Sequence, residues 1–345
     1  MGDGAGRVVK ILAIDGGGIR GLIPALILHE LERRLGAAGE KRSFASIFDL
    51  IAGTSTGALI ALGLALPKSI EATSGSRDHA SSPALSLDDI VDLYAKRGQE
   101  IFPPDLRRKL RSTVQAFRCK YDGTGLDRVL NETFGEATLK DGLTNLLVTS
   151  FDSKSMQPHC LKNRPHRLEW ADDSNFYMRD AARASSAAPT FFPPALIGPV
   201  PDNGERYSLI DGSIFANNPA LHAYVEATKI YPNAKEFLIL SLGTGDDPKG
   251  FPHGDIAKWG FIEWVNPMKR MPLLSMMSAG QSESANHMLK RIDGVRYFRI
   301  SGKLEGCSLA MDDSSPANLS ALRLIAHRII DDNAGQFDIL LNALQ

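Results

Sequence analysis

Two short apolar runs, each ending in a glycine-rich turn before a helical pattern, most constrain the fold of this chain. The first run, Val8 to Ile14, leads into Asp15 and three consecutive glycines. The second run, Phe48 to Ala52, leads into the sequence Gly-Thr-Ser-Thr-Gly at 53–57. A short apolar run that enters a tight turn is typical of a buried strand. Strands that alternate with helices build a mostly parallel sheet covered by helices on both faces.

The same alternation continues along the chain. Further strands are predicted at 145–151, 209–210 and 236–242, and helices at 19–35, 55–66, 87–101, 177–186, 316–330 and 336–344. The 345 residues are 43% hydrophobic and 23% charged, which is typical of a globular protein. We therefore predict an α/β fold in a single domain spanning 1–345, with a mostly parallel central sheet and helices on both faces.

The composition excludes several classes of function and location. A formal net charge of −1 argues against binding a nucleic acid polymer over the whole surface. The three cysteines are far apart in the sequence and are predicted to be reduced thiols. The most apolar stretch, Leu50 to Pro67, is interrupted by glycines and falls short of the ~20 apolar residues of a membrane span. The first residues lack the apolar segment of a secretory signal, so a cytoplasmic location is expected.

The first glycine loop allows two interpretations. Gly16, Gly18 and Gly21 match the spacing of a dinucleotide-binding loop, but Glu40 does not end a strand, as the acidic partner of that motif would. Successive glycine amides before a helix also form a cradle for an anion, including a transient oxyanion. Arg20 adds a positive charge beside it. A nucleotide-binding α/β module therefore remains an alternative at this point.

The second loop indicates a nucleophile. Gly53 and Gly57 flank Ser55 between a predicted buried strand and an apolar helix, which is the context of a nucleophile elbow. A serine hydroxyl needs a base to become nucleophilic. His222 and His287 lie on predicted helices rather than in glycine-marked loops after a strand, so neither is the favoured base.

Asp211 is the favoured base. It follows the apolar pair Leu209-Ile210 and precedes Gly212, which places a carboxylate at the end of a short strand. Because the carboxyl ends of parallel strands share one edge of a sheet, Ser55 and Asp211 are predicted to meet there. An aspartate with an ordinary pKa near ~3.9 is a weak base, so burial would have to raise that pKa.

The order of four blocks, 15–21, 53–57, 184–193 and 211–212, resembles the patatin-like phospholipases. The likeness spans about 8–245, so 246–345 is expected to be a helical extension packed on this core. The resemblance implies Ser55 as nucleophile and Asp211 as general base without a histidine. It also implies an oxyanion hole formed by the amides of Gly16, Gly17 and Gly18, with Arg20 supporting the loop. It implies neither a metal nor a cofactor.

The implied reaction is a phospholipase A-type hydrolysis through an acyl-serine intermediate. One departure from the family pattern is Ser213, where the residue after Asp-Gly is more usually glycine or alanine.

Two segments could contact a phospholipid membrane. The stretch 105–120 is basic and amphipathic, and it carries Arg107, Arg108, Lys109 and Arg111. The stretch 259–277 is rich in aromatic residues and methionines, including Trp259, Phe261 and Trp264. Core packing or contact between copies of a homo-oligomer is the alternative for both segments.

The resemblance extends to bacterial patatin-like effectors that degrade the inner membrane when a cyclic nucleotide of antiviral signalling binds. It therefore implies a cyclic-nucleotide activator and a protein peripheral to the inner face of the membrane when active. Nothing in the sequence identifies a nucleotide pocket, and a constitutive acyl hydrolase remains open.

Overall fold

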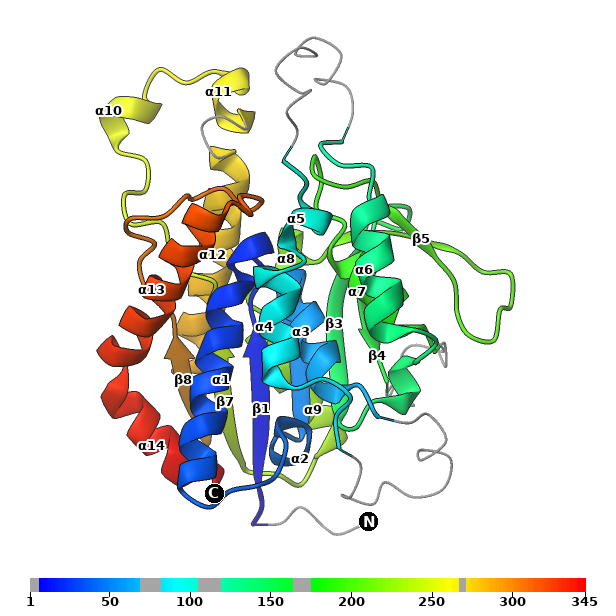
Figure 1. The fold of residues 1–345 in the computed structure, drawn as a ribbon, viewed down its shortest axis with the longest axis vertical. Helices are drawn as coiled ribbons and strands as arrows, with labels where there is room; N and C mark the ends of the chain where they lie inside the picture. The colour runs from blue at the N-terminus through cyan, green and yellow to red at the C-terminus, as the bar shows by residue number, and fades with distance from the viewer. Residues whose placement is uncertain (1–5, 69–81, 105–118, 164–174, 267–270) are drawn as a thin grey trace.

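An eight-stranded sheet runs through the centre of the structure, a computed structural model that describes residues 6–68, 82–104, 119–163, 175–266 and 271–345. The strand order is β5-β6-β3-β2-β1-β7-β8, with β4 paired to β3 outside this path (Figure 1). The strands are β1 (Val8–Ile14), β2 (Leu50–Thr54), β3 (Asn145–Asp152), β4 (Gln157–Lys162), β5 (Ala195–Ile197), β6 (Tyr207–Asp211), β7 (Glu236–Leu242) and β8 (Val295–Ile300).

The sheet is mixed. β1 is parallel to β2 and β7, β2 is parallel to β3, and β7 is parallel to β8. β4 and β6 are antiparallel to β3, and β5 is antiparallel to β6. The α/β fold with a parallel central part is thus confirmed, while β4 and β5 were not predicted. The polar sequence of β4 and the three-residue length of β5 give no periodic signal.

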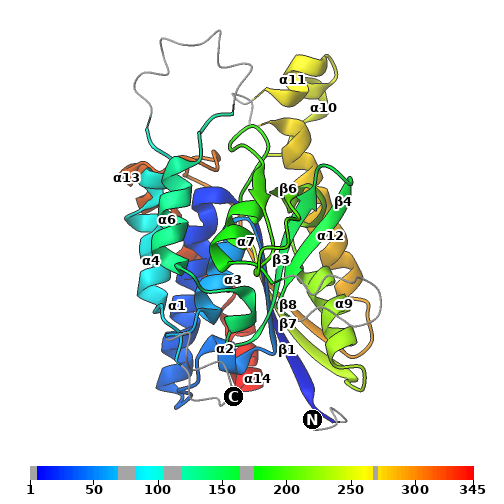
Figure 2. The ribbon, with the colours of Figure 1, turned by 90° about the vertical axis from the view of Figure 1, so that its right-hand side faces the viewer.

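Helices cover both faces of the sheet. Figure 2 shows α1, α3, α4, α6 and α7 on one side and α9 and α12 on the other. The longer helices are α1 (Leu22–Ala37), α3 (Thr56–Ala65), α4 (Leu87–Ala95), α6 (Thr124–Phe134), α7 (Met178–Ser185), α9 (Ala220–Ile230), α12 (Pro272–Leu289), α13 (Pro316–Asp332) and α14 (Ala334–Leu344). The short ones are α2 (Phe44–Ile47), α5 (Gly98–Ile101), α8 (Ser213–Ala216), α10 (His253–Ile256) and α11 (Phe261–Val265).

Strand β1 shows why a continuous apolar run is needed at the centre. Leu12 and Ile14 pack into the core beneath the larger helical layer. Val9, Ile11 and Ala13 pack into the second core, beneath α9 and α12. Side chains alternate between the two faces of a strand, so a strand that is covered on both faces is apolar throughout.

The ends of some elements differ from the prediction. β2 begins at Leu50 rather than Phe48, because residues 44–47 form the short helix α2. Residues after 245 include β8 as well as helices, and β8 pairs with β7 at the edge of the sheet. Its two arginines, Arg296 and Arg299, interrupt the apolar pattern that would have predicted a strand.

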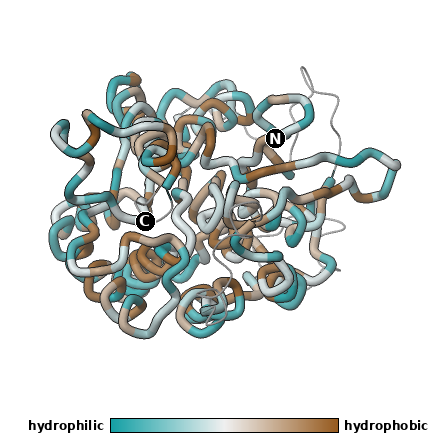
Figure 3. Tube along the Cα trace, turned by 90° about the horizontal axis from the view of Figure 1, so that it is seen from above, coloured by the Kyte–Doolittle hydropathy of each residue, from teal (hydrophilic) through white to brown (hydrophobic). Residues whose placement is uncertain are grey.

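The surface of the molecule carries one projecting connection. The β5–β6 connection projects from the molecule, and its tip is hydrophilic (Figure 1, Figure 3). Among the described residues, no helix is both long and apolar enough to cross a bilayer. The predicted basic contacts Arg107, Arg108, Lys109 and Arg111 lie outside the described residues.

Candidate active site

Ser55 occupies a strained turn between β2 and α3. Its backbone has φ 54° and ψ −120°, a conformation that is unfavourable for a residue with a Cβ. A Cβ on Gly53 would lie 2.2 Å from the Gly57 carbonyl oxygen, and one on Gly57 would lie 2.1 Å from the Ile14 carbonyl oxygen. The turn therefore needs glycine at both positions, and the tight crossing of β1 and α3 holds the serine in place.

Buried hydroxyl groups fix the backbone of this turn. The Ser55 N–H donates to Ser185 Oγ at 2.8 Å, and Ser185 Oγ donates to the Thr149 carbonyl at 2.7 Å. Thr149 Oγ1 donates to Thr54 Oγ1 at 2.7 Å, and Thr54 Oγ1 donates to the Ala216 carbonyl at 2.6 Å. The block 184–193 therefore packs beside Ser55 through a chain of polar contacts.

Asp211 meets Ser55 by a different route from the one predicted. β6 is antiparallel to β3, with Asp211 opposite Ser150, so β6 enters the sheet from the carboxyl edge of β3 rather than ending there. The predicted meeting of the two side chains is confirmed, but the parallel-strand argument for it was wrong. The Ser55 hydroxyl lies beside the Asp211 carboxyl group, near enough to lower its pKa, and both residues line one pocket. The Ser213 N–H donates to Asp211 Oδ1 at 2.8 Å.

Burial changes the acid–base behaviour of Asp211. The side chain is only 1% exposed, and this burial raises the pKa of Asp211 from 3.8 to about 6. The hydrogen bond from the Ser213 N–H and the nearby hydroxyls of Ser55 and Ser213 oppose that rise. The carboxylate is therefore ionised at neutral pH and is a stronger base than an exposed aspartate.

The first glycine loop turns only part of its backbone toward Ser55. The Gly16 N–H donates to the Asn217 carbonyl at 3.1 Å, so this amide is already engaged, in contrast to its predicted place in an oxyanion hole. In the described part of the chain, the Gly17 and Gly18 amides have no acceptor. Both residues line the same pocket as Ser55. These two amides are thus the available donors of the loop.

Close contacts explain why this loop consists of glycines. A Cβ on Gly17 would lie 2.3 Å from Thr244 Oγ1, and one on Gly18 would lie 2.1 Å from the Met311 carbonyl oxygen. That carbonyl accepts the Ile19 N–H at 2.8 Å. Arg20 Nε donates to the Gly17 carbonyl at 3.3 Å, so Arg20 does contact the loop.

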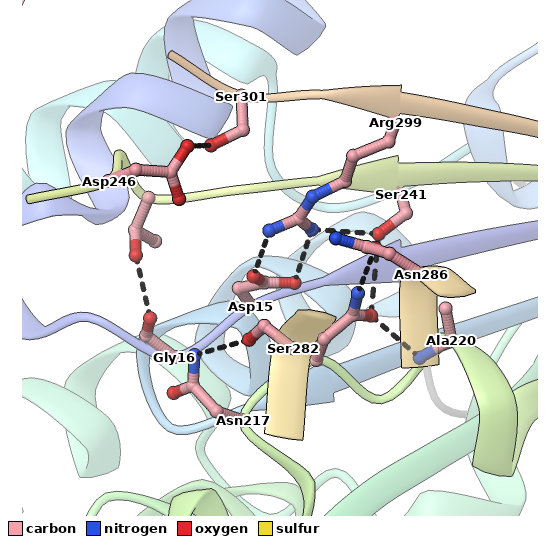
Figure 4. Close-up of polar contacts among 12 residues, drawn as sticks. Asp15, Gly16, Asn217, Ala220, Ser241, Asp246, Ser282, Asn286, Arg299 and Ser301 are labelled. Atoms are coloured by element: carbon pink, nitrogen blue, oxygen red, sulfur yellow. Dashed lines mark hydrogen bonds and ion pairs between the residues drawn. The ribbon is translucent and has the colours of Figure 1, made fainter. Parts of the chain in front are cut away.

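A buried ion pair lies at the start of the loop (Figure 4). Arg299 of β8 donates to both carboxylate oxygens of Asp15, at 2.6 and 2.8 Å, and to Ser241 Oγ at 2.9 Å. Burial alone would lower the pKa of Arg299, but the Asp15 carboxylate outweighs burial and raises that pKa. Charge-assisted, bidentate contacts of this kind hold backbone geometry firmly, and here they fix the residue before Gly16.

A pocket opens beside Ser55, Asp211, Gly17 and Gly18, with about 880 Å³ of empty space that includes open solvent. Most of its other lining is apolar: Ile19, Leu59, Ile101, Phe102, Leu126, Phe191, Phe192, Leu274 and Met311. The site thus combines a serine hydroxyl, a buried carboxylate base, two available amides and room for an apolar chain. Trp259, Phe261 and Trp264 do not line this pocket.

Comparison with known proteins decides the family. A family model described as Patatin-like phospholipase matches residues 12–224, more than half of the chain. The chain belongs to the patatin-like phospholipase family. The resemblance stated from the sequence is thereby confirmed, and membership supports a lipid acyl hydrolase.

Relatives match nearly the whole patatin-like chain. "Patatin-like protein 2" of Arabidopsis thaliana is 33% identical over 92% of this chain and 81% of its own length. "Patatin-like protein 2" of Oryza sativa subsp. indica is 30% identical over 96% of this chain and 86% of its own length. "Probable inactive patatin-3-Kuras 1" of Solanum tuberosum is 30% identical over 97% of this chain and 91% of its own length. The crystal structure of VipD from Legionella pneumophila aligns with 95% of this chain and 68% of its own chain, at 13% identity and a TM-score of 0.37.

Several residues of this patatin-like site were not predicted from the sequence. Ser185 lies in the block 184–193, and Asn217 follows the block 211–212. These motifs indicated the regions near the site, but they did not predict the hydrogen bonds of the two residues. Thr244 follows the predicted strand 236–242, and its Oγ1 donates to the Gly16 carbonyl at 2.7 Å. Arg299 and Met311 carry no local signal, because their contacts arise only from the tertiary fold.

Proposed function

We propose that this protein is a serine hydrolase that cleaves acyl esters of membrane phospholipids, with Ser55 as nucleophile and Asp211 as general base. The observation that carries the proposal is the position of the Ser55 hydroxyl beside the buried Asp211 carboxyl group at the wall of an apolar pocket. A nucleophile adjacent to its base is the arrangement that covalent acyl transfer requires.

The reaction begins when Ser55 Oγ attacks the ester carbonyl and its proton passes to Asp211. The carbonyl oxygen becomes an oxyanion, for which the Gly17 and Gly18 amides are the available donors. When the tetrahedral intermediate collapses, the C–O bond breaks and the leaving lysophospholipid oxygen takes the proton from Asp211. Asp211 then accepts a proton from water, whose oxygen attacks the acyl-serine. The fatty acid leaves, and Ser55 regains its proton.

The pocket lining supports the substrate class. Its aromatic and aliphatic side chains suit the acyl chain of a lipid, because apolar surface leaves water when that chain enters. The nucleotide-binding alternative has less support, because the Gly16 amide already donates to Asn217 and Gly18 lies against the Met311 carbonyl.

Labelling with a fluorophosphonate probe tests the nucleophile. We expect the wild-type protein to be labelled and Ser55→Ala to show no labelling and no ester hydrolysis, because the attacking oxygen is gone. Equal thermal unfolding of the two proteins is the control for folding. Labelling of Ser55→Ala at the wild-type rate would mean that another residue is the nucleophile.

Activation by a cyclic nucleotide and a role in antiviral defence stay predictions. The same labelling experiment tests the first of them when it is repeated with a panel of cyclic nucleotides. Labelling only in the presence of one nucleotide is the result expected of a switched effector. Equal labelling with and without nucleotide would identify a constitutive hydrolase.

Ser213 offers a test of how the base is tuned. We expect Ser213→Ala to move the acid limb of kcat/KM upward, by up to about 1 pH unit, because the Ser213 hydroxyl lowers the pKa of Asp211 in the wild type. The measurement is the pH profile with a water-soluble ester. Ser213→Thr, which keeps a hydroxyl, is the matched control and should retain the wild-type profile. A downward or absent shift in Ser213→Ala would contradict this role.

A further inference from the structure

Four large apolar side chains are exposed close together on α11 and the first turns of α12. Phe261 is 81% exposed, Ile262 72%, Leu273 47% and Met277 46%. We call these four residues the α11–α12 patch. Single exposed apolar residues are ordinary on protein surfaces, but a group of them marks a surface that contacts a membrane, another protein or a ligand.

Local contacts support the backbone under this patch. Glu263 caps α11 by accepting the Gly260 N–H at 3.0 Å, and α11 packs against α12. The half-buried ring of Trp259 lies edge-on to Trp264, with ring centroids 5.4 Å apart. Because Glu263 is the one charged residue of α11 and is used as a cap, the outer side of this helix is left to Phe261 and Ile262.

The patch is continuous with the pocket of Ser55. Leu273 and Met277 are exposed, whereas their neighbours on the same helix, Leu274 and Ser278, line the pocket. Just before the helix, Met271 Sδ accepts a hydrogen bond from Thr190 Oγ1 at 3.5 Å. The first turns of α12 therefore form a boundary between the apolar surface and the apolar pocket. Figure 1 shows α11 and the start of α12 at the end of the molecule toward which β1 points.

We infer that the α11–α12 patch docks the protein onto a lipid bilayer. This inference rests on the proposed function and names how the substrate reaches that site. An acyl chain that moved from a bilayer through water into the pocket would expose its methylene groups on the way, at a cost in free energy. Contact between the patch and the hydrocarbon removes that exposure. Tryptophan side chains, with one polar N–H on an apolar ring, suit the boundary between lipid and water.

The test compares two double variants in the Ser55→Ala background, so that no lipid is consumed. Phe261→Asp/Ile262→Asp alters the patch. Leu324→Asp/Ile339→Asp alters side chains that are 68% and 61% exposed on α13 and α14, and it is the matched control. We expect the patch variant to bind phosphatidylcholine vesicles at least tenfold more weakly in co-sedimentation, and the control to bind like its parent. Equal binding by both variants would overturn the inference.

A second readout uses the native tryptophans. Trp259 and Trp264 border the patch, so vesicles that contain brominated lipid should quench tryptophan fluorescence of the parent protein but not of the patch variant. Absence of quenching in the parent would place these residues away from the bilayer. The patch would instead be a contact between two copies of the chain if two results were found together. The parent would bind no vesicles, and it would sediment as a dimer while the patch variant sedimented as a monomer.

Failure of the docking surface and failure of the proposed function give different results. With Ser55 intact, the patch variant should keep fluorophosphonate labelling and hydrolysis of a water-soluble ester, but hydrolyse vesicle phospholipid at least tenfold more slowly. Equal hydrolysis of vesicles by the patch variant would overturn docking while leaving the catalytic proposal intact. Vesicle binding without any labelling of Ser55 would overturn the catalytic proposal while leaving docking intact.

Discussion

Replacing Asp211 with asparagine should abolish most activity and stabilise the fold at the same time. Without a carboxylate to take the Ser55 proton, kcat/KM should fall by about 10²–10⁴-fold. Burial holds the pKa of Asp211 near 6, whereas its ordinary value is 3.8. The free energy of unfolding of Asp211→Asn should therefore exceed that of the wild type by up to about 3 kcal/mol at pH 8.

The sign of this effect follows from proton binding. Between pH 3.8 and about 6 the folded protein holds the Asp211 proton more tightly than the unfolded chain does. The wild type therefore loses stability as pH rises through this range, because a buried carboxylate becomes charged. Asparagine carries no charge at any pH, so the advantage of the variant should shrink as pH falls toward 4. Urea unfolding at a series of pH values measures it.

Asp202→Asn is the matched control for this substitution. Asp202 is exposed, and hydrogen bonding to Arg206 lowers the pKa of its carboxyl group, so its replacement should bring no gain in stability at pH 8. Activity should also be retained. If Asp211→Asn kept wild-type activity, Asp211 would not be the base. If the free energy of unfolding of Asp211→Asn were below that of the wild type at every pH, burial of the charged Asp211 carboxylate would not destabilise the fold.

The sequence was informative wherever local geometry dictates residue type. The glycines at 53 and 57 predict a crowded turn around Ser55, and the aspartate before Gly212 indicates the end of a strand. These signals identified both side chains of the proposed dyad. They could not show the direction of β6, because a five-residue strand carries no information about its neighbour. The meeting of Ser55 and Asp211 was thus predicted correctly, although β6 was wrongly predicted to be parallel to its neighbour.

Three successive glycines predicted an anion cradle, but not which amides are available. That depends on Asn217, whose carbonyl takes the Gly16 N–H, and on the position of Met311 beside Gly18. Both partners reach the loop through the tertiary fold, from positions far along the chain. Spacing within a motif cannot specify such contacts, because they depend on how these distant segments pack beside the loop.

Arg299 supports the start of the glycine loop through its ion pair with Asp15, and no sequence motif predicts this contact. Its replacement should have a large effect on stability and on the reactivity of Ser55. Arg299→Met removes the partner of the buried Asp15 carboxylate and should lower the free energy of unfolding by about 3–5 kcal/mol at pH 8. Labelling of Ser55 should also slow at least tenfold, because Asp15 immediately precedes the glycine loop that lines the pocket with Ser55. Arg206→Met, which breaks an exposed ion pair, is the matched control and should change neither quantity measurably.

The pH dependence and a double variant separate lost charge pairing from lost packing. Burial raises the pKa of Asp15 and Arg299 opposes that rise, so the pKa should be higher still in Arg299→Met. The deficit of Arg299→Met should therefore shrink as pH falls and the carboxyl group is protonated. Asp15→Asn/Arg299→Met has no charge to leave unpaired and should recover most of the stability lost by Arg299→Met alone. A deficit that is equal at every pH, and equal in the single and double variants, would mean that Arg299 acts through packing. The hydrogen bonds of Gly16 with Asn217 and Thr244, rather than the ion pair, would then hold the glycine loop in position.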